Sequence, residues 1–197
     1  MVAHPTSTPL SVAAYMLFER HSQSKHEYVD GYVYAMAGGT PTHGVITANV
    51  TTALRTHLRG GPCRVYSADV QVQLTPTRYV YPDVPVGCDA RDRVPAGEVQ
   101  TCICYPTLAV EVLSPTTEAY DRGDKFALYR SNEPLRQYVL VNARQVSVEV
   151  FTRTAADTWV YHAYGPGDEI ALESLGFRCP IAVFYDCLLY TSDAADE

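Results

Sequence analysis

A single acidic residue interrupts an apolar run near the middle of this chain. The run covers residues 108–113 with the sequence Leu-Ala-Val-Glu-Val-Leu, and it lies between Pro106 and Pro115. A continuous apolar run of this length, with prolines on both sides, is typical of a β-strand that is buried on both faces. Ionised Glu111 is costly in such a strand unless a cation or a metal ion pairs with it. The run therefore predicts a β-sheet core in which Glu111 either belongs to a metal site or is satisfied by an arginine or by backbone amides.

A second acid, Asp83, lies in another strand-like segment. Residues 79–86 read Tyr-Val-Tyr-Pro-Asp-Val-Pro-Val, which combines aromatic and β-branched residues. Two carboxylates on neighbouring core strands suit a divalent cation, because such ions prefer oxygen ligands. Asp83 and Glu111 are therefore the first candidates for a metal site.

The hydrophobic pattern predicts an α/β domain of the α+β type. Segment 26–36 reads as a hairpin that turns at Asp30-Gly31, a pair typical of two-residue loops. No strand–helix unit is repeated, which argues against a Rossmann fold or a barrel. The predicted helices cover 11–21, 42–59 and 121–130, and the further predicted strands cover 63–74, 79–88, 107–113, 136–142, 146–153 and 158–164.

Length and composition favour one domain. The chain has 197 residues, of which 47% are hydrophobic, enough for a sizeable core. No apolar stretch reaches the roughly 18 residues that a membrane span needs, and segment 1–9 lacks the features of a signal peptide. We therefore expect a cytoplasmic protein without membrane partners, whose six cysteines are free thiols. Cys102 and Cys104 have no second ligand pair at zinc spacing, which argues against a zinc site.

The C-terminal segment 187–197 differs in character from the rest. Its sequence, Cys-Leu-Leu-Tyr-Thr-Ser-Asp-Ala-Ala-Asp-Glu, resembles a translated transposase mosaic-end adapter from a sequencing library. We therefore expect a single domain over residues 1–186 and a non-native tail over 187–197. Without the tail acids Asp193, Asp196 and Glu197, the formal net charge changes from −7 to −4.

The acidic net charge limits how this protein can hold a polyanion. A value of −7 argues against a broad electrostatic grip on nucleic acid. It leaves room for a local basic groove, because basic residues gather in the central part of the chain. These residues are Arg55, Arg59, Arg64, Arg78, Arg122, Lys125 and Arg130.

Several short motifs follow one another in order. Tyr-Pro-Asp83 is followed by Glu111-Val-Leu-Ser-Pro-Thr-Thr and by Asp121-Arg-Gly-Asp-Lys125, and Lys-His-Glu27-Tyr-Val-Asp-Gly and Thr-His43 precede them. This string closely resembles the Uma-type family of putative restriction endonucleases, within the PD-(D/E)XK nuclease superfamily, over about residues 10–186. The resemblance implies a restriction-endonuclease-like fold, in which helices flank a mixed β-sheet with the acids at its centre.

The resemblance also implies roles for the acids and for one lysine. Asp83 matches the Asp of the PD element and Glu111 the acid of the (D/E)XK element, and in this superfamily both hold Mg²⁺ or Mn²⁺. The sequence departs from the pattern two residues after Glu111, where Leu113 stands in place of the catalytic lysine. Lys125 is the nearest replacement. The alternative is that Lys125 forms only an exposed ion pair with Asp121, one helical turn earlier.

Two further residues carry open alternatives. Glu27 matches the family's glutamate before the hairpin turn, and it is either a third acid at the metal or a solvated strand residue. His43 precedes the second predicted helix. It either contacts substrate or shuttles a proton, or it is structural.

These observations leave hypotheses from different classes of protein. The first is a metal-dependent DNA endonuclease that hydrolyses phosphodiester bonds. The second is a nuclease fold without nuclease activity that serves as a nucleic-acid-binding or regulatory module. The displaced lysine and the acidic net charge support this second hypothesis. A third is a hydrolase of another phosphate ester. Convergence of Asp83, Glu111 and Lys125 on one solvent-accessible point would favour the first hypothesis over the second. We also expect a homodimer, because cleavage of both strands of a duplex commonly uses two-fold symmetry.

Overall fold

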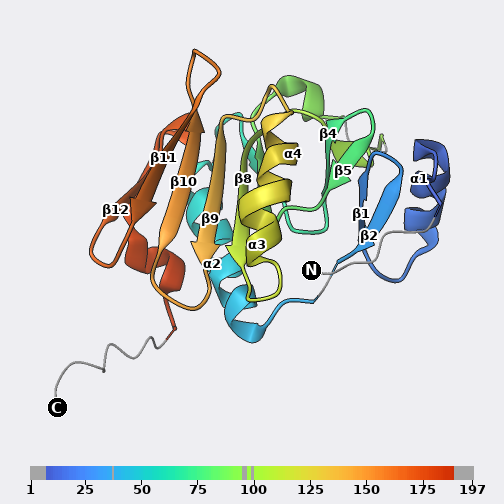
Figure 1. Cartoon of the computed structure of the whole chain (residues 1–197). Coiled ribbons are helices and arrows are strands. Elements are labelled where there is room, and N and C mark those ends of the chain that lie inside the picture. Colours follow the sequence, from blue (N-terminus) through green and yellow to red (C-terminus); the bar gives the residue numbers. More distant parts are fainter. Residues whose placement is uncertain (1–7, 37, 95–96, 99, 189–197) are drawn as a thin grey trace.

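Two β-sheets lie side by side in this protein, and helices pack against them (Figure 1). The computed structural model describes residues 8–36, 38–94, 97–98 and 100–188. Parallel and antiparallel strands occur together, and the helices lie outside the sheets. The predicted α+β class with a mixed β-sheet flanked by helices is therefore confirmed.

The larger sheet has six strands in the order β11-β10-β9-β8-β6-β3. The central pair, β8 and β9, is parallel, and the other pairs are antiparallel. β8 is the strand predicted from the apolar run, and its residues 108–113 are all buried. The strands are β3 (Arg64–Val65), β6 (Val84–Gly87), β8 (Pro106–Leu113), β9 (Gln137–Asn142), β10 (Val148–Arg153) and β11 (Trp159–Tyr164).

The smaller sheet has five strands in the order β2-β1-β5-β4-β7. Its β1–β2 hairpin confirms the predicted one, and the turn residues Asp30 and Gly31 have positive φ angles of 49° and 104°. The strands are β1 (His26–Val29), β2 (Tyr32–Ala35), β4 (Gln71–Thr75), β5 (Arg78–Val80) and β7 (Cys102–Ile103). A separate hairpin of β12 (Glu169–Leu172) and β13 (Phe177–Pro180) was not predicted.

Helices cover both faces of the larger sheet, and α1 (Val12–His21) packs against the smaller one. The others are α2 (Pro41–His57), α3 (Glu118–Tyr120) and α4 (Phe126–Arg130), with short 3-10 turns elsewhere. α2 belongs to the core cluster that contains Val110, whereas Tyr129 of α4 belongs to the cluster that contains Ala109. Alternate residues of a strand point to opposite faces. Glu111 therefore points to the face of Ala109, toward α4.

A π-helical turn joins α3 to α4. The helical segment predicted over 121–130 begins earlier, at Glu118, and its middle part, η2 (Asp121–Lys125), has π geometry. Single π turns inside helices occur frequently at functional sites. Asp121 and Lys125 are both buried, so this turn presents two charged side chains to the protein interior.

Two of the predicted strands are broken in the structure. Segment 63–74 forms β3 and β4, and segment 79–88 forms β5 and β6. The reason is that the chain changes sheet within each segment: it crosses from the larger sheet to the smaller one after β3 and returns at residues 81–83. Asp83 therefore lies directly before β6 rather than within a strand.

The prediction that all cysteines are free thiols was wrong. Cys63 and Cys88 form a disulfide. The pairing of Arg64 with Gly87 across β3 and β6 explains this bond, because it brings the flanking cysteines next to each other. Cys102, Cys104, Cys179 and Cys187 are free.

Two other expectations concern membrane spans and the C-terminal segment. No helix within the described ranges is long and apolar enough to cross a membrane. The segment expected to be non-native, 187–197, lies outside the described residues from position 189 onward.

Candidate functional site

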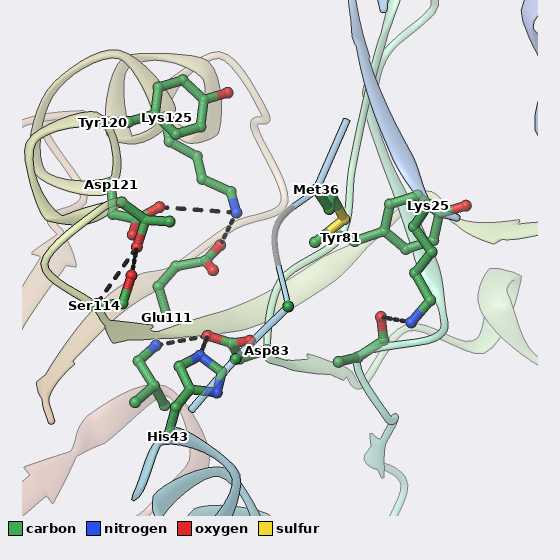
Figure 2. Close-up of a pocket in the computed structure, with 15 residues that line it drawn as sticks. Lys25, Met36, His43, Tyr81, Asp83, Glu111, Ser114, Tyr120, Asp121 and Lys125 are labelled. Carbon is green, nitrogen blue, oxygen red and sulfur yellow. Dashed lines mark hydrogen bonds and ion pairs between the residues drawn. The ribbon is translucent and has the colours of Figure 1, made fainter. Parts of the chain in front are cut away.

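A polar pocket of about 340 Å³ opens where the two sheets and the helical segment 118–130 meet (Figure 2). Four of the residues singled out in the sequence line it: His43, Asp83, Glu111 and Lys125. The fifth, Glu27, lies next to this pocket and contacts Lys125. Segments far apart in the sequence therefore bring the candidate residues together, and we call this cavity the acidic pocket.

Glu111 is buried at the floor of the acidic pocket, with 3% of its surface exposed. Its Oε1 accepts a hydrogen bond of 2.8 Å from the hydroxyl of Tyr129 and lies 2.9 Å from Lys125 Nζ. Burial raises the pKa of Glu111 well above its usual value, although Lys125 opposes this effect. Among the described residues, the partners of Glu111 are thus a lysine and a tyrosine, and neither an arginine nor a backbone amide is among them.

Lys125 reaches the acidic pocket from the π turn. Its Nζ lies 2.9 Å from Glu111 Oε1 and 3.0 Å from Glu27 Oε1, but 3.9 Å from Asp121 Oδ1. The alternative of an exposed pair with Asp121 was wrong, because 6% of the lysine side chain is exposed and the shorter contacts are to the other two acids. Burial alone would lower the pKa of Lys125, but these carboxylates outweigh it and raise the pKa well above its usual value.

Glu27 is a buried residue of β1, which excludes its reading as a solvated strand residue. Besides Lys125, it accepts hydrogen bonds from the backbone amide of Tyr81, at 3.3 Å, and from the hydroxyl of Tyr120, at 3.1 Å. Glu27 therefore holds Lys125 from the side of the smaller sheet, while Glu111 holds it from the larger one.

Asp83 lies beside Glu111 across the pair β6 and β8. Val84 pairs with Val110, which places the preceding residue, Asp83, next to the residue that follows Val110. Asp83 Oδ2 accepts a hydrogen bond of 2.7 Å from the backbone amide of Val112 and lies 3.1 Å from His43 Nε2. The two acids lie next to each other as predicted, but only Glu111 is in a strand, because Asp83 directly precedes β6.

His43 occupies the first turn of α2, where Thr40 caps the helix. The hydrogen bond to Asp83 raises the pKa of His43 above its usual value, and burial opposes this shift. His43 and Asp83 therefore form a hydrogen-bonded pair at the edge of the acidic pocket that faces α2 (Figure 2).

Sequence reasoning missed one acid of this pocket. Asp121 is 4% exposed, lines the acidic pocket and lies on the same helical segment as Lys125. Burial raises the pKa of Asp121, and Lys125 opposes the shift. The signal was present in the Asp121-Arg-Gly-Asp-Lys125 string, but Asp121 was read only as a partner of the lysine.

The oxygen atoms of the acidic pocket fit a hard cation. Asp83 Oδ1 and Glu111 Oε2 accept no hydrogen bond among the described residues, so each carboxylate retains one available oxygen. Mg²⁺ and Mn²⁺ favour such ligands and keep several waters, so two carboxylates suffice to hold one. Within the described ranges, no group of three or more His, Cys, Asp or Glu side chains is close enough to form a complete cage.

Comparison with known proteins gives relatives along nearly the whole chain. The uncharacterized protein slr1290 of Synechocystis sp. (strain ATCC 27184 / PCC 6803 / Kazusa) is 40% identical over 194 residues, covering 96% of this chain and all of the relative. The uncharacterized protein sll1609 of the same organism is 26% identical over 161 residues, covering 81% of this chain and 90% of the relative.

A solved structure shares the fold. The crystal structure of a putative nuclease belonging to DUF820 from Anabaena variabilis ATCC 29413 matches with a TM-score of 0.75. The match covers 90% of this chain and 98% of the other, at 14% sequence identity.

Family comparison agrees with the motifs that line the acidic pocket. The Uma2 family, described as putative restriction endonucleases, matches residues 12–182. This range contains Glu27, His43, Asp83, Glu111 and Lys125. The chain therefore belongs to the Uma2 family of putative restriction endonucleases, a family of nucleases.

Proposed function

We propose that this protein is an endonuclease that hydrolyses phosphodiester bonds of DNA and depends on Mg²⁺ or Mn²⁺. The observation that carries the proposal is the placement of two carboxylates, Asp83 and Glu111, beside one buried ammonium group, Lys125, in a pocket that solvent reaches. Family membership supports a nuclease, and the chemistry of these side chains supports the dependence on a divalent metal.

Asp83 and Glu111 are the proposed metal ligands. Glu111 comes from β8 and Asp83 directly precedes its neighbour β6, so the pairing of these strands positions both, and each retains one available carboxylate oxygen. When bound, the metal ion supplies a water of lowered pKa and stabilises negative charge on the scissile phosphate. Asp121 lines the same pocket and adds negative charge that favours a cation.

Lys125 is proposed to replace the catalytic lysine that the superfamily pattern places two residues after the acid. Leu113 occupies that position and is buried in the core cluster beside α4. An ammonium group in this pocket can orient the attacking water or neutralise charge that develops on the phosphate. Glu27 and Glu111 fix its position from two sides.

His43 is proposed to orient Asp83 and to contact the substrate. Its Nε2 donates to Asp83 Oδ2, which leaves the other oxygen of that carboxylate to the metal. Because this hydrogen bond raises the pKa of His43, the ring is charged over a wider pH range than a free histidine. A charged imidazole at the rim of the pocket attracts a phosphate group.

A nucleic-acid-binding module without cleavage is the second candidate. One observation favours it: the Lys125 ammonium group is paired with the same Glu111 carboxylate that a metal ion would use. In that case the ion pair is purely structural, and the pocket binds no divalent metal. Metal binding therefore discriminates between the two candidates.

The test is cleavage of supercoiled plasmid with Mn²⁺, comparing the protein with its Asp83→Ala variant. Nicking or linearisation by the parent alone supports the proposal, and so does a melting temperature that Mn²⁺ raises in the parent but not in the variant. Absence of both effects in well-folded protein rejects the metal-dependent nuclease. A homodimer is proposed as the form that cuts both strands, and sedimentation in the presence of duplex tests it.

A further inference from the structure

Three arginines gather around a second pocket at the C-terminal end of α2. This pocket of about 390 Å³ is lined by Arg55 of the last turn of α2, by Arg59 just beyond the helix and by Arg64 of β3. Thr52 and Thr56 add two hydroxyl groups. The pocket shares no lining residue with the acidic pocket, and we call it the arginine pocket.

The charge of the arginine pocket is not compensated. Arg55, Arg59 and Arg64 are exposed, and none of them forms an ion pair with an acid within the described ranges. By contrast, Arg78 and Arg122 each pair with a carboxylate. No Asp or Glu lines the arginine pocket, although the chain as a whole has a net charge of −7. Such a local cationic site attracts anions against the field of the whole protein.

A purely structural explanation covers only part of this cluster. Arg55 lies in the last turn of α2, where a cation stabilises the negative end of the helix dipole. Arg64 belongs to the edge strand β3, and its Nη1 donates to the carbonyl oxygens of Gly61 and Cys63. These bonds anchor the guanidinium beside the helix while its Nε and Nη2 donate to no described residue. Stabilisation of the helix end by Arg55 does not explain why Arg64, which belongs to another element, lies there as well.

Guanidinium and hydroxyl groups on one face are suited to phosphate oxygens. Thr52, Arg55 and Thr56 follow the spacing that places residues along one side of α2, and Arg59 follows in the turn after the helix. Planar guanidinium groups bind phosphate through paired N–H donors, and threonine hydroxyls donate to phosphate oxygens as well. We propose that the arginine pocket binds backbone phosphates of a nucleic acid at a distance from the bond that is cut, an inference that rests on the proposed function.

α2 links the arginine pocket to the acidic pocket. His43 lies in its first turn and Arg55 in its last, so the two pockets are separated by about 18 Å along the helix axis at a rise of about 1.5 Å per residue. Figure 1 shows α2 on the face of the larger sheet opposite to α3 and α4. Phosphates of one strand follow one another about every 3.4 Å along a duplex axis. A strand held at the acidic pocket carries further phosphates that the arginine pocket can bind.

Binding of short labelled DNA without divalent metal tests the inference. The variant is the triple substitution Arg55→Gln, Arg59→Gln and Arg64→Gln, and the matched control is Arg20→Gln, Arg136→Gln and Arg144→Gln. The control arginines are also exposed and unpaired within the described ranges, so both triples remove the same charge. Fluorescence anisotropy over a range of salt concentrations is measured for duplex and single-stranded probes.

We expect the arginine-pocket variant to bind DNA about tenfold or more weakly at low salt, with a salt-dependence slope smaller by about 3. The control triple is expected to change affinity less than about threefold. Equal losses of DNA affinity in both triple variants would show that only the net charge of the protein matters, and they would overturn the inference. So would an unchanged affinity of the variant, or a parent that binds neither probe.

Failure of this inference and failure of the proposed function are distinguishable. Plasmid cleavage by the parent, together with unchanged DNA affinity of the arginine-pocket variant, rejects the inference alone. Arginine-dependent binding in a parent that cleaves nothing supports the inference and rejects the nuclease. Inorganic phosphate as a competitor distinguishes a site for free anions from a site for DNA. If several phosphates of one DNA molecule bind together, only high concentrations of inorganic phosphate displace the labelled DNA.

Discussion

Lys125 Nζ lies 2.9 Å from Glu111 Oε1, and the lysine reaches this carboxylate from a helix rather than from the strand that carries the acid. Two acids from different sheets, Glu27 and Glu111, thus share one ammonium group. A buried cation with two carboxylate partners fixes the distance between the sheets at this point. It also supplies the positive charge that Leu113 cannot supply.

Substitution Lys125→Met is expected to destabilise the protein by about 3–5 kcal/mol at neutral pH, because it leaves buried carboxylates without their cation. The loss should be smaller under mildly acidic conditions, where Glu111, with its raised pKa, takes up a proton. Urea unfolding of parent and variant at both pH values measures the difference. The control is Lys25→Met, whose partner Asp69 is exposed, so that this pair contributes about 1 kcal/mol or less.

Substitution Glu111→Gln is expected to keep the fold, because the amide oxygen can still accept the hydrogen bond from Tyr129. Removal of one carboxylate ligand should weaken Mn²⁺ binding by about tenfold or more and abolish cleavage. Isothermal titration with Mn²⁺ measures the affinity. Unchanged affinity in a folded variant would exclude Glu111 as a metal ligand.

Substitution Asp83→Asn is expected to lower the pKa of His43, because the carboxylate that raises it is removed. A raised folded-state pKa stabilises the native protein below the unfolded pKa of histidine, and this contribution disappears as the pH rises through the folded-state value. The stability difference between parent and variant should therefore be larger near pH 6 and below than at alkaline pH. NMR titration of the histidine ring and urea unfolding across pH check both statements, and a pH-independent difference would contradict them.

Loss of the Cys63–Cys88 bond is expected to destabilise the protein by about 3 kcal/mol, because the bond closes a segment with a sequence separation of 25. Thermal unfolding of a variant with Cys63→Ala and Cys88→Ala measures this. Cys187→Ser, an exposed free cysteine, is the control and should leave the melting temperature unchanged. A reductant that lowers the melting temperature of the parent but not of the double variant would attribute the effect to the bond itself.

The sequence predicted the central part of the site because strand patterns are local. The apolar run identified β8, and the alternation of side chains along it accounts for the direction of Glu111. The helix carrying His43 was predicted from short-range periodicity and is present, whereas the segment carrying Lys125 was predicted as helical but begins earlier and has a π turn. The adjacency of Asp83 and Glu111 was inferred from two strand-like segments and agrees with the observed pairing.

The features that sequence reasoning missed depend on contacts between distant segments. The burial of Glu27 and Asp121 arises only when the smaller sheet closes against the helical segment 118–130. The disulfide depends on the register of β3 against β6, which local pattern does not determine. Hairpin β12–β13 follows segments with weak alternation and is fixed by packing against the larger core.

The π turn between α3 and α4 determines the angle about the helix axis at which the side chains after the turn point, relative to those before it. Each residue of a regular helix advances about 100° around the axis, so one additional residue in a turn offsets everything beyond it by that angle. Deletion of Gly123, within the turn, would restore a regular spiral and rotate Lys125 together with α4 relative to α3. The ammonium group would then point away from Glu27 and Glu111, while the length and composition of the helix would hardly change. The position of the Lys125 ammonium group is thus encoded in the pitch of a single turn as much as in the identity of the charged residues around it.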